Sequence, residues 1–426
     1  MSDVMNIIKD FRYGCPCGME HTTTIKDVRI GSGLVSCVGE ILKENNFSKN
    51  ILLVADKNTL KASEGIEKSL EGFNVEYKLY DNIRVAEMFH VEEIEALISG
   101  RDISVLSVGS GSVNDPCRLA CARQNKLLCI FATAPSMDGF ASYSSPIVDN
   151  YFKASYDAKS PEIIIADTKI LAAAPAHLKS SGFGDMIAKY IGICDWEISN
   201  VLSGEYYCER ISEYVRKTVD ELLLMADTVT VNNEKTAGAI FEQLLKTGIF
   251  MSFTKNSRPA SGSEHIIAHL MECLELPHGV IPNFHGEDVG VATLKMLKLY
   301  KEMAKLDKIT ARRENVDWED VYKVYGDMAE DVRKLNTPTT VTDAVDPRDL
   351  ESKWGKIREI INKLPDYDRV YDAMKRAGCK TTLEEIEKSK EFYNKCVKYS
   401  PYMRRRITLL RLKDMICEME KYCYDI

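Results

Sequence analysis

Short apolar runs alternate with amphipathic stretches over the first 170 residues of the chain. The continuous run Ile51–Ala55 is typical of a strand that is buried on both faces. Similar runs or polar–apolar alternation predict further strands at Thr24–Ile30, Val75–Tyr80, Ile103–Val108, Leu127–Ala132 and Ile163–Ala166. Helical periodicity separates them at Leu34–Lys43, Thr59–Leu70, Val91–Ser99 and Asn114–Gln124. Strands separated by helices of this size predict a parallel sheet with right-handed crossovers.

The pattern changes in the second part of the chain. Residues 144–168 contain a polar middle between two apolar segments, which predicts a β-hairpin before the last strand. Beyond Pro175 the strand signals fade and the periodicity is helical. We therefore predict an α/β protein with a parallel-sheet domain at residues 1–175 and an all-helical domain at residues 176–426. Within the latter, the polar stretch 310–350 is predicted to be a loop-rich insertion.

The composition narrows the class of protein. A chain of 426 residues has room for two or three domains, and 45% apolar with 28% charged residues is the balance of a folded globular protein. The formal net charge of −8 and the lack of a long basic run argue against nucleic-acid binding. No stretch approaches the ~18 apolar residues of a membrane helix, and there is no apolar signal core, so we expect a cytoplasmic protein. The thirteen scattered cysteines should mostly be reduced and buried.

A glycine-rich turn follows the predicted strand Ile103–Val108. It reads Gly109-Ser-Gly-Ser-Val-Asn-Asp115 and leads into a helix. Glycines let the backbone approach a ligand, and free N–H groups at a helix start bind anions, so the turn suits the pyrophosphate of a dinucleotide in a Rossmann-like domain. The third glycine of the usual fingerprint is missing, and a plain strand-to-helix turn is the alternative. Asp56 ends an earlier strand, where a carboxylate either accepts ribose hydroxyls or caps the next helix.

A second polar turn leaves the strand Leu127–Ala132. It reads Thr133-Ala-Pro-Ser-Met-Asp-Gly-Phe-Ala-Ser142. Thr133, Ser136 and Ser142 can donate hydrogen bonds to a phosphate or to the nicotinamide amide. Asp138 can bind a substrate hydroxyl. Because this turn leaves the sheet at the same edge as the glycine-rich turn, we favour a shared ligand over a surface loop with Asx-turn chemistry.

A dispersed set of carboxylate and imidazole side chains predicts a metal site in the helical half. His265 and His269 share a helix face, because they lie four residues apart on a helix that Ser261-Gly-Ser-Glu264 opens with capping-box spacing. His285 and Asp185 each stand at a further expected helix start. One carboxylate and two imidazoles give a divalent ion three ligands and leave positions for a substrate oxygen. An ordinary, partly exposed helix face is the alternative for the histidine pair.

The segment Cys15-Pro-Cys-Gly-Met-Glu-His21 has half of the side chains of a zinc site. No second pair of ligands follows nearby. We therefore interpret the segment as a folded loop.

Taken in order, these motifs resemble the sn-glycerol-1-phosphate dehydrogenases, a family of the iron-type alcohol dehydrogenase and dehydroquinate synthase-like superfamily. The resemblance runs from residue 25 to residue 300 and includes Gly-Phe-Gly-Asp185 and His285-Gly-Glu. Its most specific part is Ser257-Arg-Pro-Ala-Ser-Gly-Ser-Glu-His265, because glycerol dehydrogenases of the superfamily carry Ala- and Gly-rich sequence there. Chain length and the Cys15–His21 start make the bacterial, arabinose-operon-type branch the most similar one.

The resemblance implies a set of site residues. Asp185, His265 and His285 would hold a divalent metal, zinc or nickel. Asp138, Asp185 and His269 would contact the substrate, and Asp56 would bind the adenine ribose. The nicotinamide dinucleotide would lie on the two turns, at Gly109, Gly111, Ser112, Val113, Asn114, Asp115, Thr133, Ala134, Pro135, Ser136 and Ser142.

The implied activity is the NAD(P)H-dependent reduction of dihydroxyacetone phosphate to sn-glycerol 1-phosphate, in a homodimer or a larger oligomer. A divalent ion would stabilise the negative charge that develops on the substrate oxygen, and His269 is our candidate proton relay. Asp56 favours NAD over NADP, because a carboxylate repels a 2′-phosphate, although the neighbouring Lys57 weakens that preference. The substrate phosphate needs a cation, for which the candidates are Arg258, Lys255 and Lys159.

Other functions stay open. A dehydroquinate synthase-like lyase would use the same fold and ion, but its first ligand is usually Glu, where this chain has Asp185. A non-catalytic metal or nucleotide sensor would not need a full set of ligands, proton relay and cofactor turns. A glycerol or other polyol dehydrogenase is the nearest enzymatic alternative, and the segment 257–265 argues against it.

Overall fold

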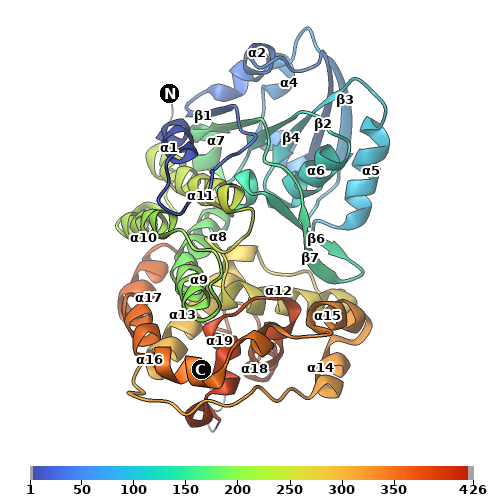
Figure 1. Ribbon diagram of the computed structural model, residues 1–426. Coiled ribbons are helices and arrows are strands. Elements are labelled where there is room, and N and C mark those ends of the chain that lie inside the picture. Colours follow the sequence, from blue (N-terminus) through green and yellow to red (C-terminus); the bar gives the residue numbers. More distant parts are fainter. Residues whose placement is uncertain (1–2, 421–426) are drawn as a thin grey trace. The chain divides into compact units, whose positions relative to one another are not determined.

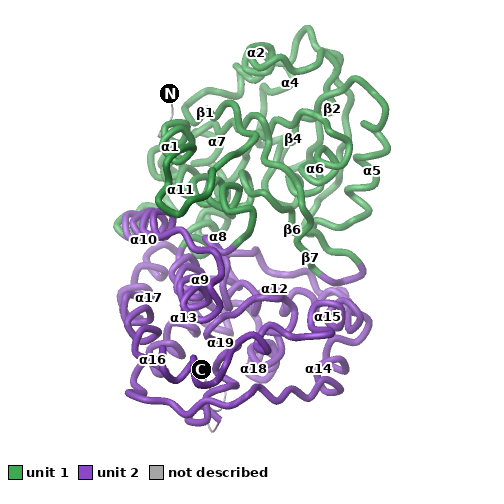
Figure 2. Tube along the Cα trace, in the orientation of Figure 1, with its two compact units in different colours: residues 1–149, 153–186, 224–257 green, residues 150–152, 187–223, 258–426 purple. Residues whose placement is uncertain are grey.

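The computed structural model describes residues 3–420, and the chain divides into two compact units (Figure 2). Unit 1 comprises residues 1–149, 153–186 and 224–257, and unit 2 comprises residues 150–152, 187–223 and 258–426. Each unit has its own buried core and is described by itself. No helix within residues 3–420 is long and apolar enough to cross a membrane.

Unit 1 is built on a six-stranded parallel sheet with the strand order β1-β8-β5-β4-β2-β3. Figure 1 labels β1 to β4 of this sheet. The strands are β1 (Asp27–Gly31), β2 (Asn50–Asp56), β3 (Asn74–Tyr80), β4 (Ser104–Gly109), β5 (Leu128–Ala132) and β8 (Ile163–Asp167). Every residue of β4, β5 and β8 is buried, because helices cover both faces of the sheet. The sheet confirms the predicted strands and the α/β fold class.

Nine helices accompany this sheet within the described part of unit 1. They are α1 (Asp3–Arg12), α2 (Val38–Glu44), α3 (Lys57–Ala62), α4 (Ile66–Ser69), α5 (Met88–Ile98), α6 (Gly111–Arg123), α7 (Thr168–Ala173), α8 (Ala176–Ile187) and α11 (Glu234–Thr254). The single helix that we predicted at Thr59–Leu70 is wrong. It is divided into α3 and α4 because Gly65 takes a left-handed conformation, with φ of 98°.

The predicted hairpin is present as the two-stranded sheet of β6 (Ser144–Asp149) and β7 (Phe152–Asp157). Its two turn residues, Asn150 and Tyr151, have φ values of 47° and 67°. Positive φ at both turn positions matches the twist of a tight hairpin.

Unit 2 is helical, as predicted for the C-terminal half. Its helices are α9 (Lys189–Ser203), α10 (Glu209–Leu223), α12 (Ser263–Glu275), α13 (His285–Met303), α14 (Trp318–Tyr325), α15 (Ala329–Asn336), α16 (Pro347–Asn362), α17 (Tyr367–Arg376), α18 (Lys390–Tyr399) and α19 (Leu409–Leu412). The prediction of a loop-rich stretch at 310–350 is wrong, because α14 and α15 lie there. Asp317 caps α14, and Val321 and Val332 bury one face of the pair, so polar composition hid two amphipathic helices.

The predicted domain boundary after residue 175 stays a prediction. The compact units divide the chain differently, since α8 and α11 both follow residue 175 and belong to unit 1. The reason is packing: α11 contacts α7 and the strands β1 and β8. A long apolar helix that covers an edge of the sheet joins the core of that sheet, wherever it stands in the sequence.

Candidate active site

The predicted cofactor residues of unit 1 follow the carboxyl ends of neighbouring strands. Gly109 at the end of β4 pairs with Ala132 at the end of β5, and β2, which ends at Asp56, lies on the other side of β4. The N–H of Thr133 donates a hydrogen bond to the carbonyl of Gly109 over 3.2 Å. The connection after β2 leads to β3 at one edge of the sheet. The connection after β4 leads to β5, toward the other edge. Such a reversal of strand order is where open α/β sheets bind ligands.

The glycine-rich turn enters its helix earlier than we predicted. Helix α6 begins at Gly111 rather than at Asn114, so the N–H groups of Gly111 and Ser112 lie in its first turn, where they have no acceptor within the helix. A Cβ on Gly109 would lie 2.7 Å from the Cβ of Val113, which explains why this position is occupied by glycine. The turn therefore has the backbone form that suits an anion such as pyrophosphate.

Two side chains of the glycine-rich turn, Ser112 and Asn114, form hydrogen bonds within unit 1. Ser107 Oγ donates to Asn114 Oδ1 over 2.5 Å, and Asn114 Nδ2 donates to the carbonyl of Gly109 over 3.4 Å. Ser112 Oγ donates to the carbonyl of Ile83 over 2.7 Å. Asn114 and Ser112 thus fix the shape of the turn, and a ligand on the turn would meet backbone groups first.

Arg118 is a fully buried arginine between the two turns that we predicted to bind the cofactor, and the sequence analysis did not single it out. Its guanidinium donates to Asp115 Oδ1 over 2.9 Å and to the carbonyls of Gly139 and Ser144 over 2.8 Å each. It also donates to the carbonyl of Ser142. Burial raises the pKa of Asp115 to about 6, although Arg118 opposes the rise. Arg118 therefore joins helix α6 to the second polar turn.

Asp56 caps a helix, which was the alternative reading of this residue. Its Oδ1 accepts the N–H of Thr59 over 2.8 Å, and the Thr59 hydroxyl accepts the N–H of Asp56 over 3.0 Å. The carboxylate is buried at the carboxyl end of β2. Its place in the sheet still agrees with contact to a ribose.

The second polar turn, Thr133–Ser142, rests on α8. A Cβ on Gly182 would lie 1.9 Å from the carbonyl oxygen of Pro135, so only glycine permits this approach. Ser181 Oγ donates to the carbonyl of Ser136 over 3.2 Å. Ser142 Oγ donates to the carbonyl of Ser144 over 3.0 Å, so this hydroxyl shapes the turn.

Asp185 lies near the end of α8 and not at a helix start, so that part of the prediction is wrong. Gly182 and Gly184 lie inside α8, and the turn 133–142 packs closely on Gly182. Asp185 is fully buried, and its Oδ2 accepts the backbone N–H of Asp138 over 2.9 Å. The two predicted carboxylate residues are therefore neighbours within unit 1.

Unit 2 brings three histidines together. The ring centroids of His265 and His285 are 5.2 Å apart, those of His269 and His285 5.6 Å, and those of His265 and His269 6.2 Å. Helix α13 begins at His285, as predicted. His265 Nδ1 lies 2.6 Å from Glu264 Oε1, a contact that orients the imidazole ring. The predicted capping box is out of register, because α12 begins at Ser263 and Glu264 accepts the N–H of Gly262.

Asp195 holds the start of α12, a role that no pattern in the sequence indicates. Its carboxylate accepts the N–H of Ser263 over 2.9 Å, the N–H of Leu409 over 2.8 Å and the hydroxyl of Tyr300 over 2.8 Å. Burial raises the pKa of Asp195 to about 6, against these hydrogen bonds. The network fixes the helix turn that carries His265.

Two of the three candidate phosphate ligands are used in ion pairs. Arg258 is buried and donates Nε to Glu205 Oε1 over 2.8 Å and a terminal nitrogen to the carbonyl of Ile407 over 2.9 Å. Lys159 Nζ lies 2.7 Å from Glu162 Oε1. Lys255 is exposed at the end of α11. Unit 2 adds a cation that the sequence analysis did not single out: Arg406 donates to the carbonyl of Ser261 over 3.0 Å.

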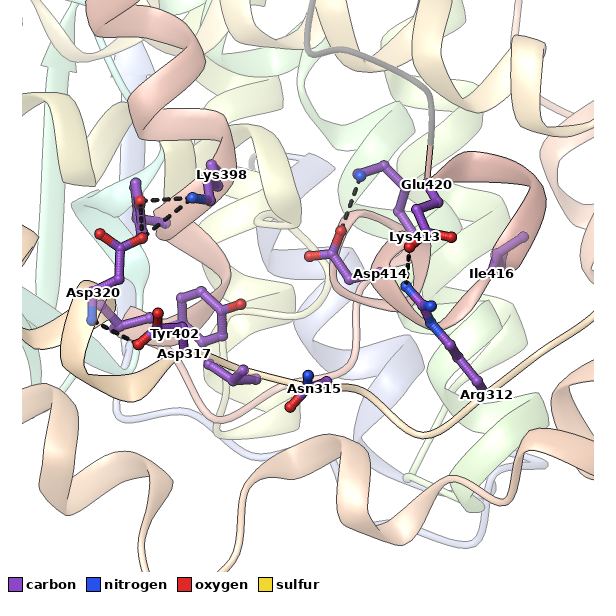
Figure 3. A pocket seen from close by; sticks show the side chains of 13 residues that line it. Arg312, Asn315, Asp317, Asp320, Lys398, Tyr402, Lys413, Asp414, Ile416 and Glu420 are labelled. Carbon is purple, nitrogen blue, oxygen red and sulfur yellow. Dashed lines mark hydrogen bonds and ion pairs between the residues drawn. The ribbon is translucent and has the colours of Figure 1, made fainter.

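A pocket of unit 2 is lined in part by charged residues, and none of the predicted site residues is among them (Figure 3). Each of its cations is paired with a carboxylate. Lys398 lies 3.3 Å from Asp320, Lys413 lies 2.9 Å from Asp414, and Arg312 pairs with Glu420. A pocket whose cations are already paired is a poor site for a phosphorylated substrate.

Comparison with known proteins identifies relatives. A family model described as iron-containing alcohol dehydrogenase matches residues 29–175. A Methanosarcina mazei protein named glycerol-1-phosphate dehydrogenase (NAD(P)+) is 32% identical over 277 residues, which are 65% of this chain and 76% of the relative. A Bacillus licheniformis protein of the same name is 25% identical over 421 residues, covering 97% of this chain and 94% of the relative.

A solved structure shows the same fold. Sulfoacetaldehyde reductase from Bifidobacterium kashiwanohense, in complex with NAD+, matches with a TM-score of 0.61 at 15% identity and covers 96% of this chain and 99% of that one. At this identity the match concerns the fold alone. The sequence relatives go further and confirm the resemblance: the chain belongs to the glycerol-1-phosphate dehydrogenases, oxidoreductases of the iron-containing alcohol dehydrogenase group.

Proposed function

We propose that this enzyme reduces dihydroxyacetone phosphate to sn-glycerol 1-phosphate with NADH or NADPH. The observation that carries the proposal is the His265–His269–His285 cluster in a member of this family. Cofactor contacts are proposed at the two turns of unit 1, at Asp56, Gly109, Gly111, Ser112, Val113, Asn114, Asp115, Thr133, Ala134, Pro135, Ser136 and Ser142. A homodimer or larger oligomer and a cytoplasmic location are also proposed.

We propose Asp185, His265 and His285 as the ligands of one divalent metal, zinc or nickel. The chemistry of the donors fits: each side chain offers one ligand atom, a carboxylate oxygen or an imidazole nitrogen. The contact of Glu264 with His265 supports this, because metal-binding histidines usually carry such a partner on the second ring nitrogen. When bound, the ion supplies a Lewis acid and the nicotinamide a hydride.

The residues of the chain then have separate tasks. Asp138 orients a substrate hydroxyl, while its backbone N–H fixes Asp185. His269 holds the proton that the substrate oxygen receives, because its imidazole lies beside the His265 and His285 rings. The buried network of Asp195 keeps the His265 turn rigid, which keeps the donors in position.

We propose Arg406 as a ligand of the substrate phosphate. Burial and the nearby Arg258 and Arg404 lower the pKa of Arg406 to about 9, while Glu205 and Glu264 oppose this shift, so the guanidinium is charged at pH 7. A charged guanidinium is a donor that suits a phosphate group. Arg258, in contrast, is held by Glu205 and is proposed to be structural.

The substrate assignment is tested with purified, metal-loaded protein. Dihydroxyacetone phosphate should drive NADH oxidation, whereas glycerol with NAD should give little activity. The reverse result would favour a polyol dehydrogenase. The stereochemistry of the product is read with a chiral glycerol-phosphate enzyme.

Two histidine variants test the roles. His265→Ala should lose metal and activity together, and full metal retention would remove His265 from the ligand set. His269→Ala should keep the metal and lose most of the turnover number. His278→Ala, in the turn between α12 and α13, is the matched control and should change neither.

A further inference from the structure

The N-terminal segment that follows α1 forms a tight turn that carries two cysteines and a histidine. The N–H of Gly18 donates to the carbonyl of Cys15 over 3.1 Å. Gly14 and Gly18 flank the turn with φ values of 70° and 78°, a conformation that other residues rarely adopt. The turn folds Cys15, Cys17 and His21 back toward one another.

The donor atoms of these three side chains converge. One ligand atom from each lies within 4.8 Å of the ligand atoms of the other two. Cys17 Sγ lies 3.4 Å from His21 Nε2. Zinc–sulfur and zinc–nitrogen bonds of about 2.3 and 2.05 Å at a tetrahedral angle place sulfur and nitrogen about 3.6 Å apart. The observed distance is therefore close to the one that a shared zinc ion would impose.

The surroundings hold the imidazole in place. His21 is fully buried and Cys15 is nearly so. The His21 ring lies 5.3 Å from the ring of Phe253 and 6.0 Å from that of Phe11. Phe11 belongs to α1 and Phe253 to α11, and these helices pack on each other. The turn thus lies where it can join the N-terminal helix to the body of unit 1.

We propose that Cys15, Cys17 and His21 form a structural zinc site, distinct from the proposed catalytic metal. Two thiolates and one imidazole are donors that zinc prefers, and thiols lose their protons when they bind it. The fourth ligand comes from outside this turn. The geometry overrides our interpretation of the segment as a plain loop, which rested on the lack of a second pair of ligands nearby in the sequence. The function of the site is to fix the α1–β1 connection on α11.

Metal analysis of the full-length protein tests the proposal. The protein is loaded with zinc, desalted and analysed for zinc per chain. Wild type should hold two equivalents, and Cys15→Ser/Cys17→Ser should hold one and keep its dihydroxyacetone phosphate reductase activity. Cys37→Ser, which replaces a half-buried thiol elsewhere in unit 1, is the matched control and should hold two. His265→Ala should lose the other equivalent, so the two sites fail independently.

A second measurement needs no variant. Zinc X-ray absorption of the wild type should show a sulfur shell at about 2.3 Å. This shell would come from Cys15 and Cys17, because the proposed catalytic ligands contain no sulfur. Hydrogen exchange in α1 should rise when a thiol-specific mercurial releases this zinc. A double variant with the same zinc content as Cys37→Ser, or a zinc spectrum without sulfur, would overturn the proposal and leave the Cys17–His21 contact as a hydrogen bond.

Discussion

Removal of the Arg118 guanidinium should destabilise unit 1 and weaken cofactor binding. Arg118 is fully buried and donates to Asp115 and to three backbone carbonyls. In Arg118→Met, the carboxylate of Asp115 stays buried without its cation. Breaking a buried ion pair from one side costs about 3–5 kcal/mol, and each lost carbonyl hydrogen bond adds about 1 kcal/mol. Protonation of Asp115 relieves part of this, so we expect a net loss of at least about 4 kcal/mol at pH 7.

The pH dependence gives an internal check. Burial already raises the pKa of Asp115 to about 6 with Arg118 present, and loss of the arginine should raise it further. The native state of the variant then binds the Asp115 proton more tightly than the native wild type does, so the variant gains more stability on acidification. Its deficit in unfolding free energy should therefore shrink as the pH falls from 7 toward 5. Arg118→Met/Asp115→Asn, which removes both charges, should be more stable than Arg118→Met alone.

The assay is urea unfolding of the full chain, followed by far-UV circular dichroism. All three tryptophans, Trp196, Trp318 and Trp354, lie in unit 2, so intrinsic fluorescence separately reports that unit. The KM for NADH should rise, because Arg118 joins the two turns that we propose to bind the cofactor. Arg123→Met is the matched control on α6; its half-exposed side chain lies 3.5 Å from Glu95, and its loss should cost less than about 0.5 kcal/mol. A loss below about 1 kcal/mol in Arg118→Met, with an unchanged KM, would refute the reasoning.

Three further predictions follow from buried contacts. In Asp195→Asn, the difference in unfolding free energy from wild type should widen by up to about 3 kcal/mol as the pH falls from 7 to 4. Burial raises the native pKa of Asp195 to about 6, so protonation favours the folded state of the wild type, whereas asparagine does not titrate. A difference that does not change with pH in urea titrations would contradict this. Gly182→Ala should lower the melting temperature and the activity, because the new Cβ would lie 1.9 Å from the carbonyl oxygen of Pro135. Gly355→Ala is the control: the space around Gly355 is open, so this variant should be neutral or more stable by up to about 1 kcal/mol. Equal melting temperatures of the two variants would exclude the close contact. Arg406→Met should raise the KM for dihydroxyacetone phosphate at least tenfold and leave that for unphosphorylated dihydroxyacetone unchanged; equal effects on both would argue against a phosphate contact.

Local patterns determined much of the first unit. Continuous apolar runs such as Ile51–Ala55 are typical of buried strands, and they predicted the strands of the sheet correctly. Glycines after β4 marked the turn that leads into α6. In unit 2, the start of α13 at His285 and the shared face of His265 and His269 follow from helix periodicity. These features depend on neighbours within four residues, which the sequence displays directly.

Tertiary contacts decided the rest. In the sequence, Arg118 cannot be told apart from an exposed arginine of an amphipathic helix. The structure shows that it is buried and donates hydrogen bonds to the turn at residues 139–144. Asp195 lies 68 residues before the N–H that it accepts from Ser263, and the Cys15–His21 segment became a candidate metal site only when its turn brought sulfur and imidazole together. The sequence names the side chains that can bind a proton, an anion or a metal. Whether a side chain does so depends on burial and on partners distant in the chain, because packing sets both.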